Sequence, residues 1–287
     1  MHINDIPVRV VGPGSQQGKL GEPPSYIDMP GDMARYDPPL MPGPDEVRHL
    51  AGAREAMQWL QAALTQCNAT RQRQLADLTQ IDDDSRKLVN QILGEGEVSV
   101  SYDGTPRAQV QESVLAGIWR TFYFDDEGQI AIDLLEVADV PHVVSAKLER
   151  VQPIDTTEPE PPMEVPNALP ILVELEDRRL DFERNGKTHS INLTLLPLSQ
   201  AELEFIDMRL GRGPVDVLSR AYGKCEVIST QSANVWWVRY FNSMGTLILN
   251  TLEVTDVPQV VIAASEDIRD SASRLNEILL PYWPDSA

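Results

Sequence analysis

The sequence predicts an α+β fold of two tandem duplicated units, each an antiparallel sheet of about four strands flanked by helices. The first observation is a stretch that occurs twice, LEVADVPHVV at residues 135–144 and LEVTDVPQVV at residues 252–261. The second is a gap-free alignment of residues 93–144 with residues 210–261, in which 19 of 52 positions are identical. The third is the order of patterns in each copy, a helical stretch followed by stretches that alternate as strands do. Two copies 117 positions apart indicate duplicated domains, and a helix followed by antiparallel strands indicates α+β.

Each copy is expected to begin with a short helix, over residues 82–93 in the first copy and 199–210 in the second. Ser199 and Glu202 have the spacing of a capping box, in which two side chains satisfy free backbone N–H groups at the helix start. A glycine follows each of the two stretches directly, and glycine commonly ends a helix.

Four strands are expected to follow in each copy, because apolar and polar residues alternate as on a half-buried strand. Gly128 and Gly245 mark the turn between the third and fourth strands, where a positive φ is required. After the fourth strand, Asp139 and Asp256 are expected to cap a helix that tolerates a proline in its first turn. The expected strands cover residues 97–102, 107–113, 117–124 and 129–137 in the first copy and 215–220, 224–230, 234–241 and 246–254 in the second.

Two amphipathic helices are expected to flank the copies, over residues 45–66 and 265–280. Each has apolar residues at the three- and four-residue spacing that places them on one face of a helix. The apolar face of the first carries Ala53, Ala56, Met57, Leu60, Ala63 and Leu64, and that of the second carries Ile268, Ala272, Leu275 and Leu279.

Proline and glycine divide the chain in two places. Residues 1–45 contain nine prolines and six glycines, a composition that excludes a helix or a central strand. Residues 152–170 contain six prolines and four acidic residues, as in a stiff, charged linker. The expected domains are a Pro/Gly-rich arm at 1–45, a first α+β repeat at 46–151, an acidic linker at 152–168 and a second α+β repeat at 169–287.

The chain is strongly acidic, with 24 Lys and Arg against 44 Asp and Glu, a net charge of −20. Phosphate backbones repel such a surface, so no nucleic-acid partner is expected, whereas a basic protein would be attracted. The alternative is that the charge serves solubility alone. No apolar run reaches the roughly 18 residues of a membrane span. The start MHINDIPVRVVGPG lacks a basic and apolar leader, so no membrane contact and a cytoplasmic location are expected.

The residues that carry chemistry form no recognised catalytic or metal-binding pattern. Cys67 and Cys225 are too few and too far apart for a CxxC site or a disulfide framework, and are expected to be reduced, buried thiols. The four histidines are isolated from one another. The glycines of LGEGEV, residues 93–98, follow a helix and precede a strand, the reverse of a phosphate-binding loop. An enzyme, a metal site and a cofactor are therefore not expected.

The third strand of each copy has two different faces. The face with Trp119 and Tyr123, matched by Trp236 and Tyr240, keeps its character in both copies and is expected to be core. The opposite face mixes arginine with large aromatic residues. This suits a buried aromatic stripe, a partly exposed sheet face or a contact surface for a partner. Its members include Arg120, Phe122, Trp237 and Arg239.

Four stretches carry a resemblance to a known family. They are GPGSQ at 12–16, LGEGEVSV at 93–100, HSINLTLLPLS at 189–199 and PQVVIAASEDIRDSASRL at 258–275. In this order they resemble the HupH/HyaF/HoxQ family of accessory proteins that are encoded with uptake NiFe-hydrogenases. The resemblance covers essentially the whole chain and is weakest in residues 17–80 and in the linker.

The resemblance implies a chaperone that assists maturation of the hydrogenase small subunit, which carries iron–sulfur clusters, before its twin-arginine export. The expected partners are the small-subunit precursor and other accessory proteins of the same operon, and the family supplies no catalytic residues. Two alternatives stay open: a factor that delivers iron or an iron–sulfur cluster, and a module that binds a small molecule between the repeats. The candidate partner-binding residues are Gly94, Glu95, Gly96, Glu97, Arg120, Phe122, Trp237, Arg239, His189, Ser190 and Asn192.

Overall fold

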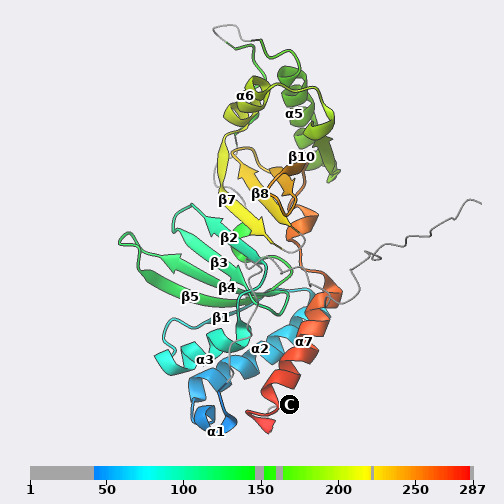
Figure 1. Cartoon of the computed structure of the whole chain (residues 1–287). Coiled ribbons are helices and arrows are strands. Elements are labelled where there is room, and N and C mark those ends of the chain that lie inside the picture. Colours follow the sequence, from blue (N-terminus) through cyan, green and yellow to red (C-terminus); the bar gives the residue numbers. More distant parts are fainter. Residues whose placement is uncertain (1–41, 146–151, 160–163, 221–222, 285–287) are drawn as a thin grey trace, which may run out of the picture. The chain divides into compact units, whose positions relative to one another are not determined.

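The strands of the described chain belong to one antiparallel sheet. The structure is a computed structural model that describes residues 42–145, 152–159, 164–220 and 223–284. The ten strands lie in the order β1-β5-β4-β3-β2-β7-β8-β9-β10-β6 (Figure 1). Helices accompany this sheet, so the predicted α+β class is confirmed.

The expectation of two sheets of about four strands is wrong, because β2 (Val98–Tyr102) pairs with β7 (Arg212–Ser219). These strands run antiparallel, from Val98 opposite Ser219 to Tyr102 opposite Val215. Unpaired, each would be the edge of its own sheet with a row of free backbone groups, and pairing satisfies those groups. The tandem duplication and the domain boundaries drawn from it stay predictions, and most of the expected arm lies outside the described residues.

The same order of elements occurs twice, and we name residues 51–145 the first half and residues 168–261 the second half. The first half contains α2 (Ala51–Thr70), β1 (Gln74–Asp77), α3 (Asp83–Leu93), β2, β3 (Ala108–Glu112), β4 (Ile118–Phe124), β5 (Ile130–Val137) and α4 (His142–Ser145). The second half contains α5 (Ala168–Asn185), β6 (His189–Asn192), the 3₁₀ turn η1 (Leu193–Leu195), α6 (Gln200–Leu210), β7, β8 (Lys224–Thr230), β9 (Val235–Phe241), β10 (Leu247–Val254) and η2 (Gln259–Val261). Outside the two halves lie α1 (Pro44–Val47) and α7 (Ser265–Leu279).

The elements expected from the repeated sequence are present close to their expected bounds. The helix expected at 82–93 is α3, and the helix expected at 199–210 is α6. Ser199 and Glu202 form the expected capping box. The glycines that follow, Gly94 and Gly211, end the two helices with positive φ angles of 55° and 59°. Local sequence signals therefore define this part of the fold.

Helix α5 and strands β1 and β6 have no counterpart among the expected elements. α5 begins inside the proline-rich stretch, where Pro170 falls in the first turn and costs no hydrogen bond within the helix. β1 and β6 have four residues each, too few to show a periodic pattern. Each pairs with the fourth strand of its half, β1 with β5 and β6 with β10.

The corner after the fourth strand differs from its prediction. In the second half the expected helix capped by Asp256 is not formed, and the corner is the short 3₁₀ turn η2. In the first half a helix begins at His142 as α4, and the residues that follow Ser145 lie outside the described ranges. Asp256 instead accepts a hydrogen bond from Asn234 Nδ2 (2.9 Å). In the first half, Glu136 at the end of β5 accepts the backbone N–H of His142 (2.9 Å). A strand carboxylate thus takes the role that the sequence assigned to Asp139.

Three hydrophobic clusters form the core. One combines α2, α3 and α7 with β4 and β5, and a second combines α5 and α6 with β9 and β10. The third covers the central strands and contains Trp119 and Trp236, which confirms that their face is core. The apolar faces predicted for the two flanking helices are also confirmed, because their residues lie in or against the first cluster.

Both cysteines are buried free thiols, as the sequence predicts. Within the described ranges, no helix is long and apolar enough to cross a membrane.

Candidate partner-binding groove

The HSINLT stretch, residues 189–194, forms the edge strand β6 and the turn that follows it. β6 pairs with β10, with His189 opposite Val254 and Asn192 opposite Thr251. It is the last strand of the sheet order, so no other strand of the described chain pairs with its outer side. Such an edge can accept an extended segment of another protein as an additional strand.

A groove of about 490 Å³ lies beside this edge. One wall comes from β6 and the residues after it, and the other wall comes from the first turns of α5. The volume lies in the range of sites that hold small ligands or a few side chains. The lining residues are Asn167, Pro170, Ile171, Glu174, His189, Ser190, Ile191, Asn192, Leu195, Leu196 and Pro197. Three predicted partner-binding residues, His189, Ser190 and Asn192, therefore lie together.

Polar contacts hold the walls of the groove in place. His189 Nε2 lies 2.8 Å from Glu174 Oε1, which joins β6 to α5. Asn192 accepts the backbone N–H of Thr194 (3.0 Å), and Thr194 Oγ1 accepts the backbone N–H of Asn250 in β10 (2.7 Å). The polar residues of HSINLT thus shape the turn that leads from β6 toward α6.

Two exposed leucines form the rim of the groove. Leu195 is 79% exposed and Leu196 is 38% exposed. They lie in the connection LTLLPLS, residues 193–199, whose counterpart LTQID in the first half is two residues shorter. Apolar side chains exposed beside an unpaired strand edge indicate a contact surface. The apolar run next to HSINLT is the sequence signal that could have identified them, whereas Glu174 and Pro170 join the groove only through the tertiary fold.

The LGEGEV corner, residues 93–98, is a separate feature that joins α3 to β2. Gly94 ends α3, and a Cβ on Gly96 would lie 2.3 Å from the carbonyl oxygen of Ser113. The backbone therefore requires glycine at both positions. Glu95 and Glu97 are exposed. A partner-binding role for this corner stays a prediction.

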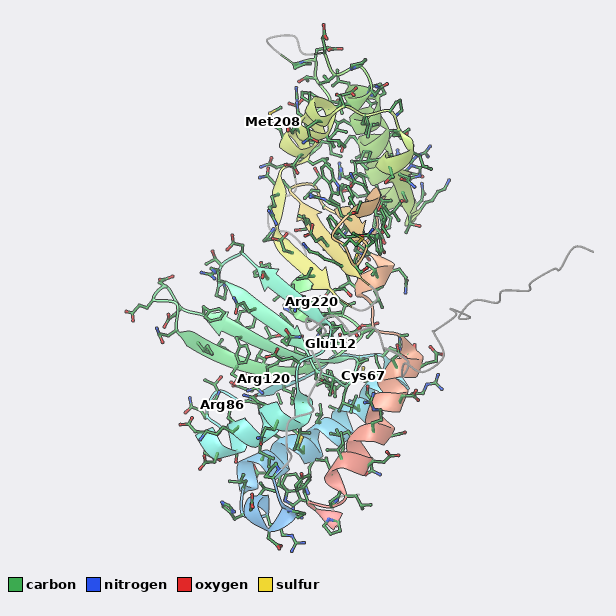
Figure 2. All side chains as sticks on the ribbon, viewed as in Figure 1. Cys67, Arg86, Glu112, Arg120, Met208 and Arg220 are labelled. Atoms are coloured by element: carbon green, nitrogen blue, oxygen red, sulfur yellow. The ribbon has the colours of Figure 1, made fainter. Side chains whose placement is uncertain are left out.

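A partly buried acid, Glu112, lies at the end of β3 close to this corner (Figure 2). Burial raises the pKa of Glu112 to about 7. Backbone hydrogen bonds from Gly117 and Val98 oppose this rise, and the carboxylates of Glu97 and Asp267 add to it. The first half therefore contains a carboxyl group that titrates near neutral pH.

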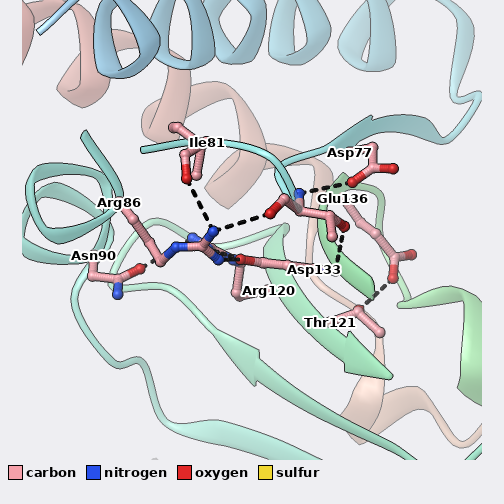
Figure 3. Close-up of polar contacts among 9 residues, drawn as sticks. Asp77, Ile81, Arg86, Asn90, Arg120, Thr121, Asp133 and Glu136 are labelled. Carbon is pink, nitrogen blue, oxygen red and sulfur yellow. Dashed lines mark hydrogen bonds and ion pairs between the residues drawn. The ribbon is translucent and has the colours of Figure 1, made fainter. Parts of the chain in front are cut away.

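Arg120 is buried in the first half and takes part in an internal ion pair (Figure 3). Its guanidinium binds Asp133 through two nitrogens, with Nη2 2.6 Å from Oδ2. Arg86 of α3 donates to the same carboxylate at 2.5 Å, and Asn90 Oδ1 accepts from Arg120 Nη1 (3.1 Å). Asp133 is fully buried. The donors of Arg120 are thus engaged inside the protein, so its partner-binding role, still a prediction, lacks an exposed guanidinium.

Trp237 occupies the position in the second half that matches Arg120. It is buried, and its Nε1 donates to Asn250 Oδ1 (2.5 Å). Arg239 lies over the Trp237 ring, 5.0 Å from its centroid, as Arg120 lies over the Phe122 ring at 5.3 Å. Each stack joins a cation to an aromatic residue two positions away on the same strand. These contacts stabilise the sheet, and binding of a partner by Phe122, Trp237 and Arg239 stays a prediction.

Nothing in the described part of the chain forms a group of three or more His, Cys, Asp or Glu side chains that could hold a metal ion. Burial raises the pKa of Cys67, and it raises the pKa of Cys225 to about 11. Burial also raises the pKa of Tyr240 to about 12. Both thiols are therefore protonated at neutral pH and are poor nucleophiles.

Fold and groove together define an α+β protein with an open strand edge, an apolar rim beside it and buried, unactivated thiols. The chain belongs to the family of HupH hydrogenase expression proteins. The family model described as "HupH hydrogenase expression protein, C-terminal conserved region" matches residues 50–155 and 165–281. This confirms the resemblance drawn from the sequence.

Curated relatives match over most of their length. The hydrogenase expression/formation protein HoxQ of Cupriavidus necator is 38% identical over 97% of this chain and 98% of its own. HoxQ of Azotobacter vinelandii is 41% identical over 96% of this chain and 98% of its own. The hydrogenase-1 operon protein HyaF of Escherichia coli is 34% identical over 70% of this chain and 71% of its own. A solved structure, the hydrogenase expression protein HupH from Thiobacillus denitrificans, is 29% identical, covers 39% of this chain and 94% of its own, and gives a TM-score of 0.38.

Proposed function

We propose that this protein is a non-catalytic, cytoplasmic chaperone that binds the precursor of a hydrogenase small subunit during maturation. The names of the relatives support a role in hydrogenase expression or formation. The observation that carries the proposal is the groove beside β6. It combines a strand edge that no other described strand pairs with, and Leu195 and Leu196, two leucines that face solvent.

An extended segment of the precursor pairs with the outer side of β6, and its alternate side chains contact the leucine rim. Glu174 lies in the wall of the groove, and the chain has a net charge of −20. Both favour a basic region of the precursor, such as its arginine-bearing signal segment. Attraction of this kind weakens as salt is added.

Co-purification with the precursor, with and without its signal peptide, tests the proposal. The double variant Leu195→Ser/Leu196→Ser is expected to bind at least tenfold more weakly, because two apolar contacts are lost. Met244→Ser is the control, since Met244 is 88% exposed in the turn before β10. Equal binding by both variants and the wild type would show that the groove is not the binding site.

Iron analysis of the purified protein separates the chaperone from a factor that delivers iron or a cluster. A complex with the precursor and an iron-free chaperone is the expected result. Stoichiometric iron together with no complex contradicts the chaperone role. Binding that is unaffected by salt and by removal of the signal peptide contradicts recognition of the signal segment.

A further inference from the structure

Helix α7 packs on α2, although it follows the second half in the sequence (Figure 1). Gln61 Nε2 of α2 donates to Asn276 Oδ1 of α7 (3.1 Å). Leu275 and Leu279 of α7 are at most 2% exposed. A helix of the same chain therefore lies along α2 beside Gln61, and the residues Gln58 and Thr65 at the margin of this contact stay exposed.

Helix α5 is the element of the second half that matches α2. Arg71 and Gly186 follow the two helices in the left-handed conformation, with φ angles of 58° and 66°. Their N–H groups bond to the carbonyls of Cys67 and Phe182. The next strand, β1 or β6, begins three residues later in both cases. A shift of 115 positions therefore matches the two helices residue by residue, and Gln61 corresponds to Glu176.

The matching flank of α5 is covered only in part. The segment 152–159 crosses it, where the backbone N–H of Ile154 donates to Glu176 (3.2 Å) and the Ile154 side chain is 4% exposed. Arg209 of α6 holds this segment through the carbonyl of Thr157 (3.0 Å). The second hydrophobic cluster contains two helices, α5 and α6. Among the described residues, no third helix packs on α5 as α7 packs on α2.

This flank of α5 is apolar at positions where α2 is polar. Leu169, Val173 and Leu180 lie along it, and Val173 and Leu180 are 53% and 40% exposed. The matching residues of α2 are Arg54, Gln58 and Thr65. Residues on the water-facing side of a helix are usually polar. An apolar stripe at these positions therefore indicates a surface that is covered in a complex.

A cavity of about 940 Å³ lies between the start of this flank and the segment 152–159. Among the described residues, its lining contains apolar and acidic side chains and no basic one. Glu158 and Glu164 are exposed there, so an occupant with positive charge is favoured over a neutral or acidic one. The lining residues are Thr156, Glu158, Glu164, Val165, Pro166, Leu169, Pro170, Val173, Ser199 and Glu202.

We propose that this flank of α5 is a docking site for a helical segment of the partner that has one apolar face bordered by Lys or Arg. The apolar face lies on Leu169, Val173 and Leu180, and the basic residues face Glu158 and Glu164. The packing of α7 along α2 is the example within this chain of a helix laid beside the matching element. The inference rests on the proposed function, because it assigns the segment to the hydrogenase small-subunit precursor.

The double variant Val173→Gln/Leu180→Thr tests the site, because it gives α5 the residues that α2 carries at the matching positions. It is expected to bind the precursor at least tenfold more weakly. Both side chains are substantially exposed, so the thermal midpoint of the free protein should stay close to that of the wild type. Leu75→Gln is the matched control, since Leu75 is 50% exposed on β1 in the first half.

A photo-reactive residue at position 173 identifies the occupant in the wild-type complex. Cross-links to a precursor segment with apolar and basic residues are expected. If the wild type binds the precursor and Val173→Gln/Leu180→Thr binds equally well, the docking site is wrong and the proposed function stands. If the wild type does not bind the precursor, the proposed function itself fails. Cross-links to residues 1–41 or to a second copy of this chain overturn the assignment of the occupant.

Discussion

The first and second halves place different chemistry at the same point of the fold. In the first half, Asp133 on β5 accepts hydrogen bonds from Arg120 on β4. In the second half, Asn250 on β10 accepts one from Trp237 on β9. The contact between the third and fourth strands is retained, and it is ionic in one half and neutral in the other.

The backbone around these residues is held in the same way in both halves. The N–H of Asp133 donates to Thr79 Oγ1 (3.0 Å), and the N–H of Asn250 donates to Thr194 Oγ1 (2.7 Å). The fold of a half therefore does not depend on a buried charge at this position. The ion pair is therefore a feature of the first half, where α3 supplies a second cation, Arg86.

Removal of the Asp133 carboxylate from the first half is expected to have the largest effect on the free energy of unfolding. Asp133→Ala leaves Arg120 and Arg86 without their anion and should lower the free energy of unfolding by about 3–5 kcal/mol. Asn250→Ala leaves the Trp237 N–H without an acceptor, and about 1–3 kcal/mol is expected. Urea unfolding of both variants measures the difference. Equal losses would contradict the distinction between the two halves.

The next largest effect on the free energy of unfolding is expected at α7, the helix that packs on the first half. Leu275→Ala on α7 opens a cavity in a closed core and should cost about 2–5 kcal/mol. Leu180→Ala on α5, at a side chain that is 40% exposed, should change the free energy of unfolding by no more than about 0.5 kcal/mol. Thermal unfolding of the two variants measures the effects. A large loss for Leu180→Ala would show that the flank of α5 is already covered in the free protein.

A smaller, pH-dependent effect is expected from Glu112, whose counterpart in the second half is Ser229. The pKa of Glu112 rises on folding from 4.5 to about 7, so the folded state holds its proton more tightly. The contribution of Glu112 to the free energy of unfolding is therefore fully present below about pH 4.5 and is lost as the pH rises through about 7. Glu112→Gln should remove this dependence and increase the free energy of unfolding at pH 8 by about 1–3 kcal/mol.

The control for Glu112 is the exposed Glu95 in the same corner. Glu95→Gln should leave the pH profile of unfolding unchanged. If Glu112→Gln keeps the wild-type slope between pH 5 and pH 8, another group is responsible for it.

The smallest effect is expected at the helix starts, where the two halves use different caps. Ser199→Ala removes the hydroxyl that accepts the N–H of Glu202 and should cost about 1 kcal/mol. Asp82 accepts the N–H of Ser85 (2.8 Å), and this backbone hydrogen bond lowers its pKa. The cost of Asp82→Ala should therefore be present at pH 7 and disappear as the pH falls through that lowered pKa. The free energies of unfolding of Ser199→Ala and Asp82→Ala, measured at pH 7 and pH 3, compare the two caps. If Asp82→Ala costs the same at both pH values, the cap does not depend on the charge of Asp82.

Local signals account for the parts of the fold that the sequence predicts correctly. The capping box of Ser199 and Glu202 and the alternation in β4 and β9 involve residues close together in the chain. The groove is predicted only in part. His189, Ser190 and Asn192 are found from HSINLT, whereas Glu174 reaches them because α5 folds back beside β6. The burial of Arg120 is not evident from its strand pattern, because it depends on contacts with α3 and β5.

By itself the sequence determined the α+β class, the internal similarity, most elements of both halves and membership of the HupH family. These follow from periodicity, caps, turns and motifs, which are properties of neighbouring residues. Only the tertiary structure decided that β2 pairs with β7 in one sheet, that α7 packs on α2, and that no helix of the described residues lies in the same way on α5. The physical reason is that these contacts join residues far apart in the chain. Their free energy comes from burial of surface and pairing of edges that no local pattern records.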